Sequence, residues 1–229
     1  MWRRLACAPT AFEEPGIQVV CTDEARLTRP GWCGVVVIGD SAVVVTPQKR
    51  PPQLDRLVES TAVPATLTDP RYVEDIIGPL EDSLGPADLQ YGTIGAASSA
   101  HVRGPLPLPD PLVERVWKNA PPAERSEAGF EDDRMEAIFV ALDGEQPLAA
   151  SGYRRWPGGI AHMGVLTIPA ARRRGLGRKA SLAAAGHATD HGLLVQWRSL
   201  WSNDASRQLG QSLGLYHCGR QFSFLLRAG

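Results

Sequence analysis

The chain has 229 residues, of which 43% are hydrophobic, and this is enough for a packed core in one large domain or two small ones. Its formal net charge of −1 argues against a protein that binds nucleic acid over its whole surface. The four cysteines show no metal-ligand spacing and fit a reducing cytoplasm, although Cys21 and Cys33 could pair. No apolar stretch predicts a signal peptide or a membrane span.

Two strands followed by two helices are predicted in the N-terminal part of the chain. Residues 34–38 and 41–46 are rich in valine and flank Gly39-Asp40, a pair typical of a hairpin turn. Residues 51–63 predict a helix, and Asp69 followed by Pro70 predicts the cap and first residue of another.

A Pro-rich stretch at residues 104–109 predicts a stiff connector and the best domain boundary in the chain. We therefore expect an N-terminal lobe at residues 1–103 and a second domain at residues 104–229. The alternative is that residues 1–103 complete the core of one larger domain.

Two helices and a hairpin are predicted after the connector. Asp110 predicts a helix cap, residues 123–129 predict a second helix, and residues 135–155 predict a hairpin that turns at Asp143-Gly144. Acidic residues gather around the second helix, at Glu124, Glu127, Glu131, Asp132 and Asp133. They are interpreted either as an acidic wall that attracts a cationic amine or as a solvated helix end.

The stretch from residue 160 to residue 185 predicts an anion site. An apolar run at residues 160–168 has the character of a strand, and Pro169 ends it. The basic, glycine-bearing segment 172–177 then leads into an alanine-rich helix. The first N–H groups of a helix have no partner inside it and carry partial positive charge, so they bind phosphate. Gly175 and Gly177 lack side chains and let an anion approach the backbone.

The details of this loop exclude two common phosphate-binding motifs. Gly177 is followed by Arg178-Lys179-Ala180, so the Gly-Lys-Ser/Thr end of a P-loop is absent. Arginine replaces the first glycine of the Rossmann fingerprint. The remaining pattern, Arg-x-x-Gly-x-Gly from Arg172 to Gly177, resembles the pyrophosphate loop of the GNAT N-acetyltransferase superfamily.

The downstream sequence extends this resemblance. Residues 193–201 predict a second strand, and Gly192 predicts the end of the helix before it. Asn203 and the triplet Leu213-Gly214-Leu215 resemble the Asn and the Leu-Gly-Phe of the family, and residues 216–226 predict the closing strand. The chain therefore resembles a two-lobed member of the superfamily, with a degenerate half-module at its N-terminus. Its abundant Arg, Ala, Gly and Pro residues are typical of a bacterial source.

The resemblance implies an α/β (α+β) fold with a mixed, mostly antiparallel central sheet, helices on both faces, and strands that splay apart where coenzyme A binds. It implies acetyl-CoA as co-substrate and no metal. The pantetheine arm would pair with the backbone of the first strand and lie near Asn203, and the phosphates would bind the loop. The residues implied in binding are Val165, Leu166, Thr167, Arg172, Arg173, Arg174, Gly175, Leu176, Gly177, Arg178 and Asn203.

The catalytic side chains of the family are replaced in this chain. Many members carry a Tyr as general acid where this chain has Gly210, and a Glu as base where it has Arg198 or, in others, Ala161. Two substitutes are available, and each has a structural alternative. His162 could act as base, or it could be a packed strand histidine; Tyr216 could act as acid, or it could be a packing residue.

The resemblance therefore implies an N-acetyltransferase that moves an acetyl group from acetyl-CoA to a primary amine, by direct attack in a ternary complex, and we expect it in the cytoplasm. The partners it implies are acetyl-CoA and an amine that could be cationic, without nucleic acid or membrane, and a homodimer fits the family. The alternative function is a non-catalytic acyl-CoA-binding regulatory module, which the replacements at Gly210, Arg198 and Ala161 favour.

Overall fold

A computed structural model gives the structure of the protein and describes residues 1–49, 51–95, 101–130 and 135–227. The chain forms two compact units. Unit 1 comprises Met1–Leu89, Ser199–Arg207 and His217–Gly229, and unit 2 comprises Gln90–Arg198 and Gln208–Tyr216. The division falls inside the long strand β4 (Leu80–Gly92), inside β9 (Leu194–Leu200) and inside helix α7 (Asp204–Ser212), so these elements contribute to both units. The boundaries of these two units differ from those of the expected domains, residues 1–103 and 104–229, which stay a prediction.

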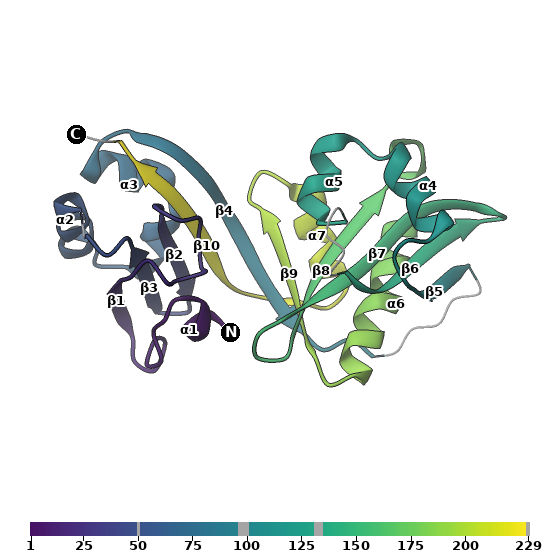
Figure 1. Ribbon diagram of the computed structural model, residues 1–229, viewed down its shortest axis with the longest axis horizontal. Coiled ribbons are helices and arrows are strands. Elements are labelled where there is room, and N and C mark those ends of the chain that lie inside the picture. Colours follow the sequence, from purple (N-terminus) through teal and green to yellow (C-terminus); the bar gives the residue numbers. More distant parts are fainter. Residues whose placement is uncertain (50, 96–100, 131–134, 228–229) are drawn as a thin grey trace. The chain divides into compact units, whose positions relative to one another are not determined.

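Unit 1 is a sheet covered by short helices (Figure 1). Its strand order is β1 (Gly16–Cys21), β3 (Ser41–Thr46), β2 (Cys33–Ile38), β10 (Tyr216–Leu226) and β4. Strand β1 is parallel to β3, whereas β2 is antiparallel to both β3 and β10. The helices are α1 (Trp2–Leu5), α2 (Pro52–Ser60), the 3₁₀ helix η1 (Pro64–Thr68) and α3 (Pro70–Ile77).

The predicted hairpin and helices of unit 1 are confirmed. Strands β2 and β3 pair antiparallel around Gly39-Asp40. The side chain of Asp69 accepts a hydrogen bond from Arg71 N, which caps α3 as expected. Alternate residues of β2, Cys33, Val35 and Val37, pack with the buried leucines of α2 because successive side chains in a strand point to opposite faces.

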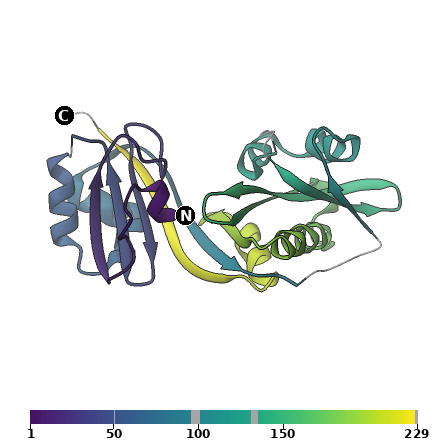
Figure 2. The ribbon, with the colours of Figure 1, turned by 60° about the horizontal axis from the view of Figure 1, so that its bottom comes forward.

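Unit 2 is a sheet between two layers of helices (Figures 1 and 2). Its strand order is β4, β9, β8 (Ile160–Thr167), β7 (Gln146–Trp156), β6 (Glu136–Asp143) and β5 (Val102–Leu106). Helices α4 (Pro111–Asn119) and α5 (Pro122–Ala128) cover one face, and α6 (Leu176–Asp190) covers the other. Asp110 accepts hydrogen bonds from Leu112 N and Val113 N and caps α4, as the sequence predicts.

Two hydrophobic clusters show which strand residues face which layer. Ala161 and Met163 of β8 pack with Ala184 and Ala188 of α6. Leu166 of β8 packs instead with residues of α4 and with β6 and β7. Odd-numbered residues of β8 therefore face α6, and even-numbered residues face the side of α4 and α5.

The strands β8 and β9 separate toward their carboxyl ends. They are parallel and pair only at Ile160–Leu194, Ala161–Val195 and His162–Gln196. The pairing of β8 with β7 continues to Thr167. The backbone of β8 beyond His162 is therefore unpaired on its β9 side, which confirms the expected splayed strands in a mixed sheet with helices on both faces.

Three elements differ from the sequence prediction or were not predicted. Residues 104–106 of the expected connector belong to the edge strand β5, which pairs with β6 across a register shift. Strand β1 was not predicted, because it lies before the valine-rich hairpin and is only partly buried. Strand β4 was not predicted either, because it contains Gly85 and Pro86, residue types that usually end a strand.

Candidate functional site

The loop between β8 and α6 presents a row of unused N–H groups. The backbone N–H groups from Arg173 to Arg178 donate to no acceptor within the described part of the chain, and the first α6 bond runs from Lys179 N to Gly175 O, at 3.0 Å. Arg173 and Gly175 both have left-handed backbones, with φ of 63° and 72°. Successive N–H groups in such a turn converge on one point and bind anions. The predicted anion site therefore has the expected backbone geometry.

The second glycine of the loop lets α6 begin against β8. A Cβ atom on Gly177 would lie 2.7 Å from Thr167 Oγ1, which is too close for two non-bonded atoms. A side chain at this position would force the Thr167 side chain or the start of the helix to shift. Gly177 thus keeps the anion site next to the separated strands.

Three of the four loop arginines have partners of their own. The side chain of Arg172 binds the carboxylate of Glu124, and that of Arg174 binds the carboxylate of Asp143. The side chain of Arg178 donates to the backbone oxygen of Ser212. The Arg172 contacts with Glu124 are 2.6 and 2.9 Å long, and the guanidinium of Arg174 lowers the pKa of the Asp143 carboxyl. These three arginines brace the loop. Arg173 has no hydrogen-bond or ion-pair partner among the described residues, so its charge is available to a ligand.

The ladder between β7 and β8 decides which backbone groups reach the open edge of β8. Ile168 N donates to Leu148 O at 3.1 Å, so the N–H and C=O of residue 168 point toward β7. In an antiparallel ladder such residues alternate. Leu166 therefore directs its backbone toward β7, whereas Val165 and Thr167 direct theirs toward the separated strand β9.

Asn203 caps a helix. Its Oδ1 accepts a hydrogen bond from Ser206 N at 3.0 Å, at the start of α7. Asn203 belongs to unit 1, whereas the loop and β8 belong to unit 2. Its expected place beside the pantetheine arm stays a prediction.

The structure explains why the position of the usual general acid is a glycine. Gly210 is buried in α7, and a Cβ atom there would overlap Gln90 Oε1 and lie 2.9 Å from the ring of Trp197. No tyrosine fits at this point. Tyr216, the substitute proposed from the sequence, begins β10 and is 76% exposed, so it does not pack in the core.

His162 lies in the middle of the sheet of unit 2. Its side chain is buried, stacks on Trp156 with 4.2 Å between ring centroids, and Nδ1 makes a 2.8 Å hydrogen bond to Gln196 Oε1. Burial lowers the pKa of His162 to about 3, and the charge of Arg198 adds to this effect. The imidazole is therefore neutral at pH 7, and because Gln196 Oε1 accepts, Nδ1 carries the proton.

Residues that sequence reasoning did not select surround His162. Gln196 Nε2 donates to the hydroxyl of Tyr91 at 2.6 Å. Arg154 is the register partner of His162 on β7. These residues come from β4, β7 and β9, and no local pattern connects them because the contact between Tyr91 and Gln196 joins positions 105 residues apart.

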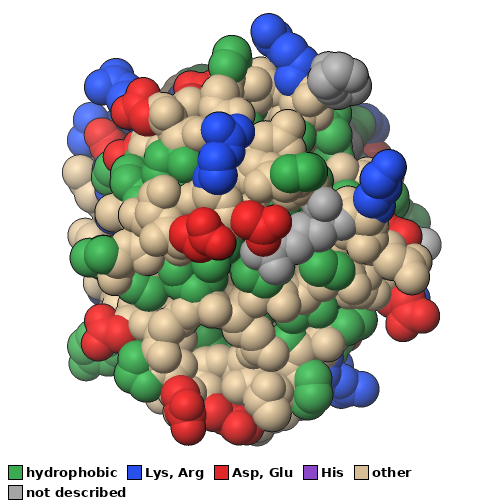
Figure 3. Space-filling model, turned by 90° about the vertical axis from the view of Figure 1, so that its left-hand side faces the viewer, with side chains coloured by type: hydrophobic (Ala, Val, Ile, Leu, Met, Phe, Trp, Pro, Cys, Tyr) green, Lys and Arg blue, Asp and Glu red, His purple; other side chains and the backbone are tan. Residues whose placement is uncertain are grey.

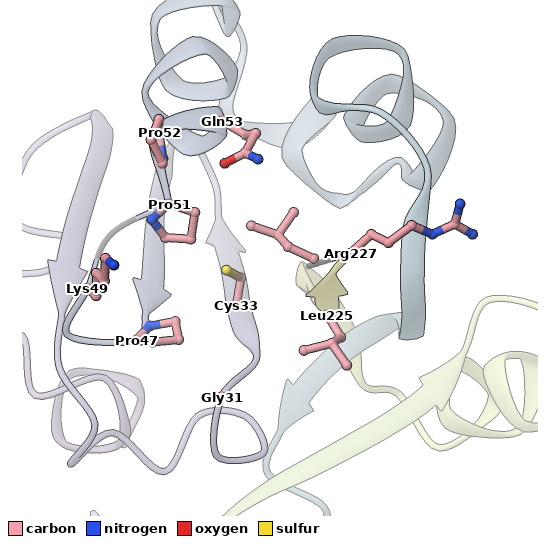
Figure 4. A pocket seen from close by; sticks show the side chains of 10 residues that line it. Gly31, Cys33, Pro47, Lys49, Pro51, Pro52, Gln53, Leu225 and Arg227 are labelled. Atoms are coloured by element: carbon pink, nitrogen blue, oxygen red, sulfur yellow. The ribbon is translucent and has the colours of Figure 1, made fainter. Parts of the chain in front are cut away.

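Unit 1 contains a cavity of about 340 Å³ that no predicted site residue lines. Its wall is largely apolar, and Figure 4 shows Lys49 and Arg227 on either side with Cys33 between them. Burial raises the pKa of the Cys33 thiol to about 11, so this cysteine stays protonated at neutral pH. On the face of this unit in Figure 3, acidic and basic side chains are interspersed.

In the described ranges, no three His, Cys, Asp or Glu side chains gather closely enough to hold a metal ion. No helix in the same ranges has the length and hydrophobicity needed to cross a membrane.

Comparison with known proteins identifies the fold. Residues 107–215 match the family described as the acetyltransferase (GNAT) family, whereas no curated protein matches significantly. A solved GNAT acetyltransferase structure from Novosphingobium aromaticivorans shares 17% identity over 66% of this chain and 68% of its own, with a TM-score of 0.52. A tandem GNAT protein from the clavulanic acid biosynthesis pathway shares 13% identity over 90% of this chain and 87% of its own, with a TM-score of 0.50.

A GNAT acetyltransferase from Colwellia psychrerythraea is 16% identical over 69% of this chain, with a TM-score of 0.49. The chain spans 62% of that structure's length. At such identities the likeness concerns the fold, and the general reaction of the family is acyl-CoA-dependent acetyl transfer to an amine. Together with the splayed strands, the family match over residues 107–215 and the likeness to the Novosphingobium structure show that the fold is the GNAT fold.

Proposed function

We propose that this chain is an N-acetyltransferase that transfers the acetyl group of acetyl-CoA to a primary amine by direct attack in a ternary complex. The observation that carries the proposal is the row of unused backbone N–H groups from Arg173 to Arg178 at the start of α6. This row suits a pyrophosphate, because each N–H can donate to a phosphate oxygen and the helix dipole has the right sign. Arg173 adds a positive charge to the same loop.

The open edge of β8 suits the pantetheine arm. The N–H and C=O groups of Val165 and Thr167 face the side where β9 has separated, so an extended amide chain can pair with them as an added strand. A backbone N–H of the same edge would stabilise the oxyanion that forms when the amine attacks the thioester carbonyl. Leu166, whose backbone faces β7, would contribute through packing.

Catalysis in this proposal depends on placement. The neutral amine attacks the carbonyl carbon, the carbon–sulfur bond breaks, and the proton lost by the amine passes through water to the departing thiolate. Holding amine and thioester together removes most of the entropic cost of the reaction. The roles of His162 as base and Tyr216 as acid stay predictions, and the buried, neutral state of His162 favours a positioning role.

The alternative proposal is a non-catalytic acyl-CoA-binding module. Gly210, Arg198 and Ala161 support it, since they replace acidic or phenolic side chains, and Ala161 is fully buried against α6. The two-lobed organisation is likewise a proposal. The 90% coverage by a tandem GNAT protein supports it at the level of the fold. A cytoplasmic location and a homodimer remain expectations from the sequence.

The test is calorimetric titration of acetyl-CoA into the wild type, Gly175→Glu and Gly192→Glu. Gly175 and Gly192 lie at opposite ends of α6 and share a φ of 72°, and an added Cβ meets no atom within 4 Å at either position. We expect Gly175→Glu to abolish binding, because its carboxylate repels phosphate, and Gly192→Glu to bind as the wild type does. Equal binding by all three proteins would reject the loop as the site. Thiol release over a panel of amines then separates the enzyme from the binding module.

A further inference from the structure

His162 lies at the point where the strands β8 and β9 begin to separate. The pair His162–Gln196 is the last one of their parallel ladder, and the two strands diverge in Figure 1. Under the proposed function, the phosphates of acetyl-CoA bind the loop after β8, and the pantetheine arm runs back along the open edge of this strand past Val165. The thioester at the end of the arm then arrives beside the last pair, next to His162.

One face of β8 is closed at this point. Ala161 and Met163 pack with Ala184 and Ala188 of α6 in a buried cluster. Successive side chains of a strand alternate between its faces, so His162 projects from the opposite face of the sheet. An amine that approaches the thioester on the face of His162 therefore does not have to displace α6.

Two hydrogen bonds fix which nitrogen of the His162 ring carries the proton. The Nε2 atom of Gln196 can only donate, and it donates to the hydroxyl of Tyr91 at 2.6 Å. The Oε1 atom at the other end of the same amide can only accept, and it lies 2.8 Å from His162 Nδ1. Tyr91 thus holds the amide of Gln196 in one orientation, and the amide keeps the proton of His162 on Nδ1.

The other ring nitrogen of His162, Nε2, is an acceptor without a donor. Among the described residues the ring makes only the hydrogen bond to Gln196, although His162 is just 7% exposed. Stacking on Trp156, with 4.2 Å between ring centroids, holds the plane of the ring. Buried polar atoms in proteins are nearly always paired, so an unpaired lone pair on a ring held in this way indicates a place for a donor from a ligand.

We propose that His162 Nε2 accepts a hydrogen bond from the N–H of the acceptor amine, with Gln196 and Tyr91 as the positioning residues behind it. The inference rests on the proposed acetyltransferase function and adds a contact to the nucleophile of that reaction. The hydrogen bond turns the lone pair of the amine toward the thioester carbon. It strengthens as the attacking nitrogen becomes positively charged, so it stabilises the transition state more than the bound amine.

The ring takes up no proton in this proposal. Burial lowers the pKa of His162 to about 3, so its lone pair is free at neutral pH but is a weak base. The proton of the amine leaves through water, as in the proposed reaction. His162 therefore contributes orientation and a hydrogen bond in place of the general base that the family's glutamate supplies.

¹⁵N NMR of the CoA complex with labelled histidines tests the ring without turnover, and His162→Phe identifies its signals among those of the five histidines. We expect the wild type to carry the proton on Nδ1. Gln196→Met removes the acceptor at similar side-chain length, and Tyr91→Phe frees the amide to turn, so each should move the proton partly to Nε2. A proton on Nε2 in the wild type, or one that stays on Nδ1 in both variants, would overturn the proposal. Tyr91→Phe decides alone if Gln196→Met does not fold.

Methylamine is the kinetic probe, because it presents little beyond the reacting amine. We expect His162→Phe to lower kcat for its acetylation by about 10- to 100-fold, the range of a hydrogen bond to a charged group, and to leave KM for acetyl-CoA within about twofold. Gln196→Met and Tyr91→Phe should lower kcat in proportion to the fraction of the ring that carries its proton on Nε2. A purely structural role would not produce that proportion. Equal kcat for the wild type and His162→Phe would refute the contact.

His187→Phe is the matched control. His187 lies on α6, which covers the other face of the sheet, and its Nδ1 forms a 3.1 Å hydrogen bond with the hydroxyl of Tyr153. The same exchange of imidazole for a phenyl ring should leave kcat for methylamine at the wild-type value. Melting curves of all variants show whether a loss of activity reflects unfolding.

Binding separates failure of the proposed function from failure of this inference. If acetyl-CoA does not bind the wild type, the proposed function fails and the contact to the amine falls with it. If acetyl-CoA binds and His162→Phe acetylates methylamine as fast as the wild type does, only the contact at His162 is wrong. If acetyl-CoA binds but methylamine does not react, the Nε2 signal of the CoA complex decides. A shift of this signal on addition of methylamine supports the contact, and an unchanged signal overturns it.

Discussion

Alanine at the two glycines that flank α6 separates the binding role of the loop from its conformational role. Gly175 precedes the helix and Gly192 follows it, and both have φ of 72°. A Cβ atom at either position meets nothing within 4 Å, so neither substitution creates a clash. The two variants, Gly175→Ala and Gly192→Ala, therefore carry the same backbone cost at opposite ends of one helix. Only Gly175 belongs to the row of unused N–H groups.

The magnitudes follow from this geometry. A left-handed backbone costs an alanine roughly 1 to 2 kcal/mol, and the loss of unfolded-state entropy offsets roughly 0.4 to 1 kcal/mol of this. Both variants should lose about 1 kcal/mol of stability, which lowers Tm by about 2 to 4 °C in a chain of this size. For binding, a methyl group at Gly175 blocks at least one N–H from a phosphate oxygen. A hydrogen bond to a charged group contributes about 1.5 to 3 kcal/mol, so Kd for acetyl-CoA should rise by about 10- to 100-fold.

Calorimetry of acetyl-CoA binding and thermal melting of the free proteins give the two readouts. We expect equal Tm values for Gly175→Ala and Gly192→Ala, weak acetyl-CoA binding by the first, and wild-type binding by the second. Equal affinities would refute the reasoning, because the N–H groups of the loop would then not hold the phosphates. Unequal Tm values without ligand would show that the two glycines differ in more than their position relative to the site.

Three further predictions concern other parts of the molecule. Gly210→Tyr restores the family's usual residue, but its added side chain would overlap Gln90. We therefore expect Tm to fall by several degrees and the rate of acetyl transfer not to rise. A stable variant with faster turnover would contradict this. Since burial lowers the pKa of His162 from 6.5 to about 3, the native state resists protonation, so stability should fall as pH drops from about 6.5 toward 3, by roughly 1.4 kcal/mol per pH unit at most. Urea titrations at several pH values measure that slope, and His162→Gln should remove this contribution. Cys33 has a raised pKa of about 11 and is only 2% exposed, so it should react with iodoacetamide at pH 8 far more slowly than the exposed Cys7. Peptide mass spectrometry measures the two rates, and equal rates would mean that the cavity opens.

The missing catalytic residues have a structural explanation. Helix α7 packs so closely on Gln90 and Trp197 that Gly210 has no room for a side chain. Ala161 is fully buried in an apolar cluster that includes alanines of α6, where a carboxylate would be costly to bury. Under the proposed function, catalysis therefore has to rely on the placement of amine and thioester.

Local patterns were sufficient for the elements that carry the anion site. The strand at residues 160–168, the helix after Gly175 and the caps at Asp69 and Asp110 are found close to their predicted positions. Each depends on nearby residues: alternation of apolar side chains, a side-chain oxygen that accepts helix N–H groups, or a glycine that adopts a positive φ. The resemblance to the GNAT family added the separation of β8 and β9, which no local pattern contains.

By itself, the sequence determined the strand, loop and helix of the candidate acyl-CoA site, because conformation and charge there depend on neighbours in the chain. Tertiary structure alone decided that Arg172, Arg174 and Arg178 brace the loop while Arg173 stays available. It also decided that Tyr91, Arg154 and Arg198 gather around His162. These contacts join residues on different strands and helices, and their geometry follows from strand order, register and the packing of helices on the sheet, none of which a single segment specifies.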